Sequence, residues 1–178
     1  MEPKVLKLKI CLVGDEAVGK TSLIRKFVTG LFDEVYIRTL GAVVSKKSVT
    51  LGGPGERPLQ VDMVILDIMG KRTFMQLFKD AYFSGARGIL AVFDLTRKES
   101  LDGLTSWIEG VRETVGPIPV VALANKLDLS ERFEVDDEDI EKVLGSYGVE
   151  IWTTSAKTGE NVEQAFMGLA RNIAVAEA

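Results

Sequence analysis

The chain has 178 residues, of which 46% are hydrophobic and 27% are charged, so it is long enough for one sizeable core and short for two domains. Its 22 basic and 26 acidic residues give a net charge of -4, which offers a polyanion such as DNA no overall attraction. The sequence holds no histidine and one cysteine, which excludes a histidine general base, a histidine zinc ligand and a disulfide within a monomer. We therefore expect one domain over residues 1–178, acting as a monomer and without nucleic acid.

The first half of the chain begins with a predicted strand. Apolar residues at 6–12 alternate with lysines, which is typical of a strand, and the glycine-bearing segment 14–21 follows. A helix with one apolar face comes next, and Gly30 is placed to end it. Residues 42–51 and 59–67 then form two strand-like runs on either side of a glycine-rich turn, which predicts an antiparallel hairpin.

The second half alternates predicted strands and helices. Short apolar runs at 88–93, 120–124 and 149–152 suit strands that are buried on both faces. Thr96 and Glu99 have the spacing of a capping box at the start of one helix. The six strand-like runs predict an α/β fold: a mostly parallel six-stranded sheet with one antiparallel edge strand, helices on both faces, and ligand loops at the carboxyl ends of the strands.

The segment 14–21 matches the phosphate-binding pattern G-x-x-x-x-G-K-[ST] and lies between a predicted strand and a predicted helix. In such a P-loop, backbone N–H groups surround phosphate oxygens and the start of the helix adds positive charge. Lys20 is placed to reach the outer phosphates, Thr21 to give its hydroxyl to Mg²⁺, and Ser22 to meet the inner phosphate. The predicted phosphate-binding residues are Gly14, Asp15, Glu16, Ala17, Val18, Gly19, Lys20, Thr21 and Ser22. The loop alone indicates a nucleoside triphosphate without fixing the base.

Two further motifs make the chain resemble the Ras, Rab and Rho small GTPases. Asn125-Lys126-Leu127-Asp128 is similar to the family's N-K-x-D motif, and a carboxylate such as that of Asp128 accepts from two donors that guanine offers and adenine does not. Ser155-Ala156-Lys157 resembles the S-A-K loop that supports the base. The resemblance implies the GTPase type of P-loop NTPase fold, a G domain, with guanine held by Asn125, Lys126, Asp128, Ser155, Ala156 and Lys157.

The resemblance extends to the segments that switch conformation in this family. Residues 67–70 are similar to its D-x-x-G element, in which the aspartate holds Mg²⁺ through water and the glycine N–H senses the terminal phosphate. Thr39 resembles the threonine that ligates Mg²⁺ when the third phosphate is present, while Phe32 and Tyr36 stand where the family has aromatics over the guanine and the phosphates. The resemblance thus implies Thr21, Thr39 and Asp67 as metal ligands, and catalytic roles for Lys20, Thr39, Gly70 and Lys71.

Two residues depart from the family pattern. Lys71 stands where the family usually has a glutamine that orients the attacking water, and a lysine has no hydrogen-bond acceptor. Glu16 stands where the P-loop residue is normally small, which puts a carboxylate near the terminal phosphate. We therefore expect slow hydrolysis. Because the two charges are opposite and the resemblance implies that they face each other, we also hypothesise that Glu16 and Lys71 pair.

The predicted function is a molecular switch that binds GTP with Mg²⁺, hydrolyses it slowly, and is read by an effector, with exchange or activating proteins as further partners. A constitutively GTP-bound pseudo-GTPase that serves as a binding module is the alternative. A P-loop kinase or ATPase is a third interpretation, and it leaves the motifs at 125–128 and 155–157 unexplained. No apolar run approaches the ~20 residues of a membrane span, and the sequence has no lipidation motif, so we expect a cytoplasmic protein without a direct lipid anchor.

Overall fold

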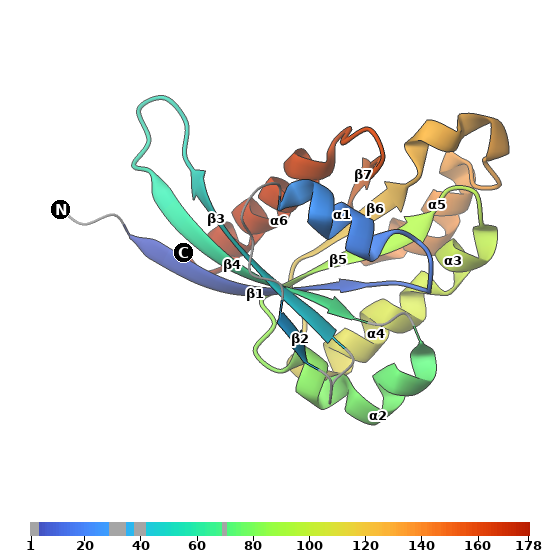
Figure 1. The fold of residues 1–178 in the computed structure, drawn as a ribbon, viewed down its shortest axis with the longest axis horizontal. Coiled ribbons are helices and arrows are strands. Elements are labelled where there is room, and N and C mark those ends of the chain that lie inside the picture. The colour runs from blue at the N-terminus through green and yellow to red at the C-terminus, as the bar shows by residue number, and fades with distance from the viewer. Residues whose placement is uncertain (1–3, 29–34, 38–41, 69–70) are drawn as a thin grey trace.

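A computed structural model describes residues 4–28, 35–37, 42–68 and 71–178 of the chain. These residues form a twisted sheet with helices packed against both of its faces (Figure 1). In this part of the chain, no helix is both long enough and apolar enough to cross a membrane.

Seven strands make up the sheet in the described residues. They are β1 (Val5–Val13), β2 (Val35–Ile37), β3 (Ala42–Leu51), β4 (Leu59–Ile68), β5 (Gly88–Asp94), β6 (Val120–Asn125) and β7 (Glu150–Thr153). Their order in the sheet is β2-β3-β4-β1-β5-β6-β7. Strand β3 runs antiparallel to β2 and β4, and every other neighbouring pair is parallel. The predicted fold class, an α/β fold with a mostly parallel sheet, is confirmed.

The structure adds one strand to the six that the sequence predicts. Strand β2 has three residues and pairs with residues 42–44 of β3, so β2 and not β3 lies at this edge of the sheet. A strand of three residues is too short to show an alternating pattern, which explains why the sequence does not reveal it. The predicted hairpin is confirmed, since β3 and β4 pair along their whole length.

The described residues also form six α-helices and two short 3-10 helices. They are α1 (Lys20–Phe27), α2 (Arg72–Phe83), α3 (Lys98–Asp102), α4 (Leu104–Val115), η1 (Leu127–Arg132), α5 (Asp137–Leu144), η2 (Gly145–Tyr147) and α6 (Val162–Ala176). Helices α1 and α6 cover one face of the sheet, and α2, α3, α4 and α5 cover the other (Figure 1). Every residue of β5 and β6 is buried, as expected for central strands with helices on both sides.

Two helix ends differ from the predictions. The capping box predicted at Thr96 and Glu99 is wrong, because α3 begins at Lys98 and has no side-chain cap. The Thr96 hydroxyl instead donates a hydrogen bond of 2.7 Å to Asp94 Oδ1 within the loop before the helix. Helix α1 ends at Phe27, ahead of Gly30, which lies outside the described residues.

The strand register brings three loops together at one edge of the sheet. Leu12 of β1 is level with Leu90 of β5, and Asp94 at the end of β5 is level with Asn125 at the end of β6. The loops that follow β1, β5 and β6 therefore start side by side. This edge is where open α/β sheets bind their ligands.

Candidate nucleotide-binding site

The loop from β1 to α1 has an unusual backbone that two glycines make possible. Gly14 and Gly19 have φ angles of 141° and 103°, and Ala17 between them has a φ of 61°. A Cβ atom on Gly14 would lie 2.2 Å from the Val92 carbonyl oxygen, and one on Gly19 would lie 2.4 Å from Asn125 Nδ2. The loop can therefore approach β5 and β6 this closely only with glycine at both positions.

Lys20, the first residue of α1, lies inside this loop. Its side chain is buried, and its Nζ donates hydrogen bonds of 2.9 Å to each of the carbonyl oxygens of Gly14 and Asp15. Burial lowers the Lys20 pKa, while the negative charges of Asp67, Asp15 and Glu16 act in the opposite direction. The loop thus holds a buried ammonium group at its centre, a charge of the kind that pairs with phosphate oxygens in a P-loop.

The structure brings Thr21 and Asp67 together, two of the residues predicted to bind the metal. Thr21 Oγ1 donates a hydrogen bond to Asp67 Oδ2, although the two residues lie on α1 and near the end of β4. A hydroxyl and a carboxylate are hard oxygen ligands of the kind that Mg²⁺ prefers, and Mg²⁺ sites in phosphate-transfer proteins use few protein ligands. This pair of donors therefore fits Mg²⁺. Ser22 lies exposed in the first turn of α1.

Asn125 joins the P-loop to the loops that follow β6 and β7. Its side chain is buried, its Nδ2 donates a 2.9 Å hydrogen bond to the Val18 carbonyl oxygen, and its Oδ1 accepts one of 3.1 Å from Thr154 Oγ1. A buried amide with both ends engaged is fixed in position. The predicted base-binding residue Asn125 is thus a connecting residue between three loops.

Asp128 in η1 lies next to the loop that contains the segment 155–157, as the prediction of a common base site requires. Ser155 Oγ donates a hydrogen bond of 2.8 Å to Asp128 Oδ1 and accepts one of 3.1 Å from the Thr158 N–H. Ala156 and Lys157 occupy the turn between β7 and α6. These contacts orient the Asp128 carboxylate, the group proposed to select the base.

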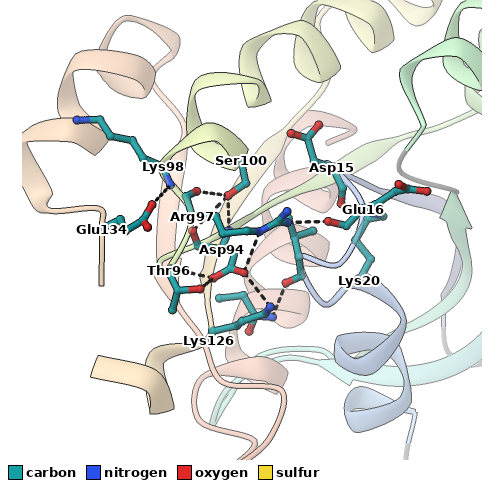
Figure 2. Close-up of polar contacts among 12 residues, drawn as sticks. Asp15, Glu16, Lys20, Asp94, Thr96, Arg97, Lys98, Ser100, Lys126 and Glu134 are labelled. Atoms are coloured by element: carbon teal, nitrogen blue, oxygen red, sulfur yellow. Dashed lines mark hydrogen bonds and ion pairs between the residues drawn. The ribbon is translucent and has the colours of Figure 1, made fainter. Parts of the chain in front are cut away.

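The buried carboxylate of Asp94 accepts hydrogen bonds from Lys126, Arg97 and Thr96 beside the P-loop (Figure 2). Its Oδ2 accepts from Lys126 Nζ at 2.8 Å and from Arg97 Nε at 3.3 Å, while its Oδ1 accepts from the N–H and Oγ1 of Thr96 at 2.8 and 2.7 Å. Burial acts to raise the pKa of Asp94, but the hydrogen bonds from Lys126 and Thr96 outweigh it and hold this pKa below its ordinary value. Asp94 is therefore an anion in the folded protein at neutral pH.

Asp94, Arg97 and Trp107 contact predicted site residues but were not themselves among the residues predicted from the sequence. Trp107 is fully buried on α4, and its indole Nε1 donates a 2.9 Å hydrogen bond to Asp15 Oδ1 of the P-loop. Signals for two of them exist in the sequence. Asp94 directly follows the buried run 88–93 at the carboxyl edge of the sheet, and a buried indole N–H requires an acceptor.

The two departures from the family pattern lie close to each other. Lys71 Nζ is 3.9 Å from Glu16 Oε1, and the two side chains are 49% and 61% exposed. This ion pair agrees with the hypothesis from the sequence. Lys71 immediately precedes α2, so the pair joins the P-loop to the start of that helix. At this exposure the pair is worth about 0–1 kcal/mol.

Phe32, Thr39 and Gly70 lie outside the described residues. Tyr36 lies in β2, where the structure describes the backbone alone.

Comparison with known proteins agrees with this arrangement of loops. A family model described as "Ras family" matches residues 9–175. The chain is 36% identical over 166 residues to the Ras-related protein Rab-8 of Diplobatis ommata, a match that spans 93% of this chain and 76% of the relative. It is 34% identical over 166 residues to the Ras-related protein Rab-8B of Homo sapiens, spanning 93% of this chain and 77% of the relative. Proteins of this family bind guanine nucleotides and Mg²⁺ and hydrolyse GTP. The chain therefore belongs to the Ras family of small GTPases and is a GTP-binding switch protein.

Proposed function

We propose that this chain, as a single G domain, hydrolyses its bound GTP slowly because Lys71 and Glu16 have replaced the usual groups around the terminal phosphate. The observation that carries the proposal is the 3.9 Å separation of Lys71 Nζ and Glu16 Oε1. It supports a charged pair at the position where the family has a neutral amide and a small residue.

The residue roles in this proposal follow from the contacts described above. Asp128, oriented by Ser155, accepts the guanine donors, with Asn125, Lys126, Ala156 and Lys157 around the base. Backbone N–H groups of residues 14–22 and the Lys20 ammonium hold the phosphates. Thr21 and Asp67 hold Mg²⁺, together with Thr39 in the GTP state. When bound, this ion neutralises charge on the phosphates.

The chemical step explains why a lysine at position 71 slows the reaction. Water attacks the terminal phosphorus, the bond from that phosphorus to the bridging oxygen breaks, and the bridging oxygen stays with GDP. The oxygen and protons of the water leave with the inorganic phosphate. The family glutamine both donates to and accepts from this water. An ammonium group only donates, so Lys71 does not align the water, although its charge stabilises the oxygens of the transferred phosphoryl group.

The same pair supports a second candidate, a constitutively GTP-bound binding module. An ion pair that ties Glu16 to the residue before α2 gives this segment a link to the P-loop that does not depend on a terminal phosphate. In that case the protein would keep its GTP, and an effector could bind it at any time. The release of phosphate without partners separates the two candidates: a slow but measurable single exponential supports the switch, and no release over days supports the module.

Single-turnover hydrolysis of preloaded GTP tests the role of the pair. We expect Lys71→Gln to raise the rate by about a hundredfold, the lower limit for a positioned proton-transfer group. We also expect the double variant with Glu16→Gly to differ from the product of the single effects, because the two side chains interact. Lys79→Gln is the control, since Lys79 lies on α2 but pairs with Glu113 at 2.7 Å, away from the P-loop. An unchanged rate in Lys71→Gln would show that Lys71 does not limit hydrolysis.

A further inference from the structure

Two carbonyl groups of the P-loop accept hydrogen bonds from side chains outside the loop, one at the end of β6 and one between β5 and α3. Asn125 Nδ2 donates to the Val18 carbonyl oxygen at 2.9 Å. Arg97 Nη2 donates to the Glu16 carbonyl oxygen at 2.6 Å (Figure 2). Arg97 lies between β5 and α3, so it is remote in sequence from both the P-loop and the guanine motif. Its contact with Glu16 is made to the backbone, and it is therefore separate from the ion pair of the Glu16 side chain with Lys71.

The direction of a carbonyl fixes the direction of the next N–H. The described residues contain no cis peptide bond, and in a trans peptide the carbonyl of one residue and the N–H of the next point in opposite directions. Because Arg97 holds the Glu16 carbonyl outward, the N–H of Ala17 points into the loop. Asn125 orients the N–H of Gly19 in the same way through Val18. Inward N–H groups are the ones that surround phosphate oxygens in a P-loop.

The Glu16–Ala17 peptide, which Arg97 contacts, directly precedes a residue with an unfavourable backbone conformation. Ala17 has a φ of 61°, in the left-handed region that an L-residue other than glycine adopts only at a cost. Backbone strain of this kind persists where the surrounding structure imposes it. The hydrogen bond to the Glu16 carbonyl acts on the peptide directly before Ala17 and so opposes its relaxation to a more favourable φ.

Arg97 is itself fixed before it reaches the P-loop. Its Nε donates to Oδ2 of the buried Asp94 at 3.3 Å, and its backbone N–H donates to the Asp94 carbonyl oxygen at 3.0 Å. Its own carbonyl accepts from Ser100 Oγ at 2.7 Å. One guanidinium group therefore contacts a carboxylate and a carbonyl at the same time, which its fork of donors allows. Lys126 pairs with the same Oδ2 of Asp94 at 2.8 Å, so the chain of contacts continues to the guanine motif.

We propose that Arg97 is a positioning residue for nucleotide binding, which holds the Glu16–Ala17 peptide in its phosphate-binding orientation and couples it through Asp94 to Lys126. The proposal rests on the nucleotide site described under the proposed function. The Arg97 side chain is 45% exposed, and the buried Asp94 carboxylate keeps its 2.8 Å ion pair with Lys126 when Arg97 is replaced. Its loss therefore affects retention of the nucleotide far more than unfolding.

The test is the dissociation rate of a fluorescent GDP from the Mg²⁺-loaded protein, measured by adding excess unlabelled GDP. We expect Arg97→Ala to dissociate GDP about tenfold faster than the parent, which corresponds to about 1.4 kcal/mol. Arg97→Lys keeps the charge but has one nitrogen for two acceptors, so its rate lies closer to that of Arg97→Ala than to the parent. The matched control is Arg87→Ala, because Arg87 precedes the other end of β5, is 58% exposed and pairs with Glu177 at 3.1 Å.

A parental rate in Arg97→Ala overturns the proposal, and so does an equal acceleration in Arg87→Ala. A parental rate in Arg97→Lys also overturns it, because it would show that charge alone suffices. The measurement is repeated at 1 M salt, where the Debye length is about 3 Å. An acceleration that persists there supports positioning, and one that disappears contradicts it. If the parent protein retains no GDP at all, the proposed function fails. If it retains GDP and Arg97→Ala behaves like the parent, only the role of Arg97 fails.

Discussion

The amide of Asn125 donates a hydrogen bond of 2.9 Å to the carbonyl oxygen of Val18, 107 residues earlier in the chain. This contact links the motif proposed to bind the base to the loop proposed to bind the phosphates. A nucleotide spans both, so the relative position of the two loops limits how well it fits. The same asparagine accepts from Thr154, which extends the link to the loop before α6.

Replacing Asn125 by alanine tests this link. We expect Asn125→Ala to lower the free energy of unfolding by about 1–3 kcal/mol, because it leaves the buried groups of Val18 and Thr154 without their partner, and to weaken GDP binding as well. Urea denaturation and GDP titration measure the two effects. Asn172→Ala is the matched control, since Asn172 donates a 2.9 Å hydrogen bond to Glu150 at the surface. Equal losses in both variants would contradict the linking role.

The close approach of the P-loop to Asn125 makes Gly19 intolerant of a side chain. Gly19→Ala places a Cβ 2.4 Å from Asn125 Nδ2 and adds the strain of a φ of 103°. Gly55 in the β3–β4 turn has a φ of 87°, and a Cβ added there would meet no atom within 4 Å. Gly55→Ala therefore carries the strain alone, about 1–2 kcal/mol.

We expect Gly19→Ala to weaken GDP binding by more than about tenfold, a factor that corresponds to about 1.4 kcal/mol. We expect Gly55→Ala to lower the free energy of unfolding and to leave the GDP affinity unchanged. Isothermal titration calorimetry of the two variants makes the comparison. Parental affinity in Gly19→Ala would mean that the loop does not need its close contact with β6.

The depressed pKa of Asp94 predicts a specific acid sensitivity. Its pKa in the folded protein lies below the ordinary value of 3.8, so on acidification the unfolded chain takes up this proton before the folded protein does. The contribution of Asp94 to stability is therefore complete above about pH 5 and is lost as the pH falls below the ordinary value toward the folded pKa.

The Asp94→Asn variant isolates this contribution. We expect it to be about 1–3 kcal/mol less stable than the parent at pH 7, since an amide no longer pairs with Lys126 and Arg97. The difference between the two proteins should shrink as the pH falls below 3.8. Denaturant unfolding at several pH values follows it, and a gap that is constant down to about pH 2.5 would contradict an ionised Asp94 in the folded state.

Cys11 provides a probe of the core beneath the site. It is fully buried on β1, its thiol donates to the Tyr82 carbonyl oxygen at 3.7 Å, and burial raises its pKa to about 12. Because the thiolate is the reactive form, we expect no reaction with a disulfide reagent at pH 8 in the folded protein and one equivalent in denaturant. Complete labelling of the folded protein within minutes would show that the sheet opens at β1.

Sequence patterns with a fixed period or a fixed motif predicted most of the fold. The hairpin at 42–51 and 59–67, the buried run 88–93 and the P-loop at 14–21 all follow from local composition. These features are local because strand alternation and glycine placement act over a few residues. The three-residue strand β2 was not predicted, because its pairing with β3 depends on the sheet already being formed.

The contacts within the site depend on tertiary structure and were harder to predict. Thr96 fits a helix cap by its spacing, yet its hydroxyl bonds to Asp94, because a buried carboxylate nearby is the stronger acceptor. Trp107 fits the apolar face of a helix, and its bond to Asp15 depends on how α4 packs under the P-loop. The pairing of Glu16 with Lys71 could be hypothesised only because family resemblance supplied their positions in space.

The central claim is that the P-loop holds a phosphate chain while Asp128 selects guanine, and competition between nucleotides tests it most directly. The protein is loaded with fluorescent GDP and Mg²⁺ and then challenged with GDP or ADP over a wide range of concentrations. We predict that GDP displaces the label near stoichiometry and that ADP requires roughly a 10⁴-fold higher concentration, as for sites that pair with a specific set of substrate donors. Equal displacement by ADP, or failure of the protein to retain any labelled GDP, would contradict the account.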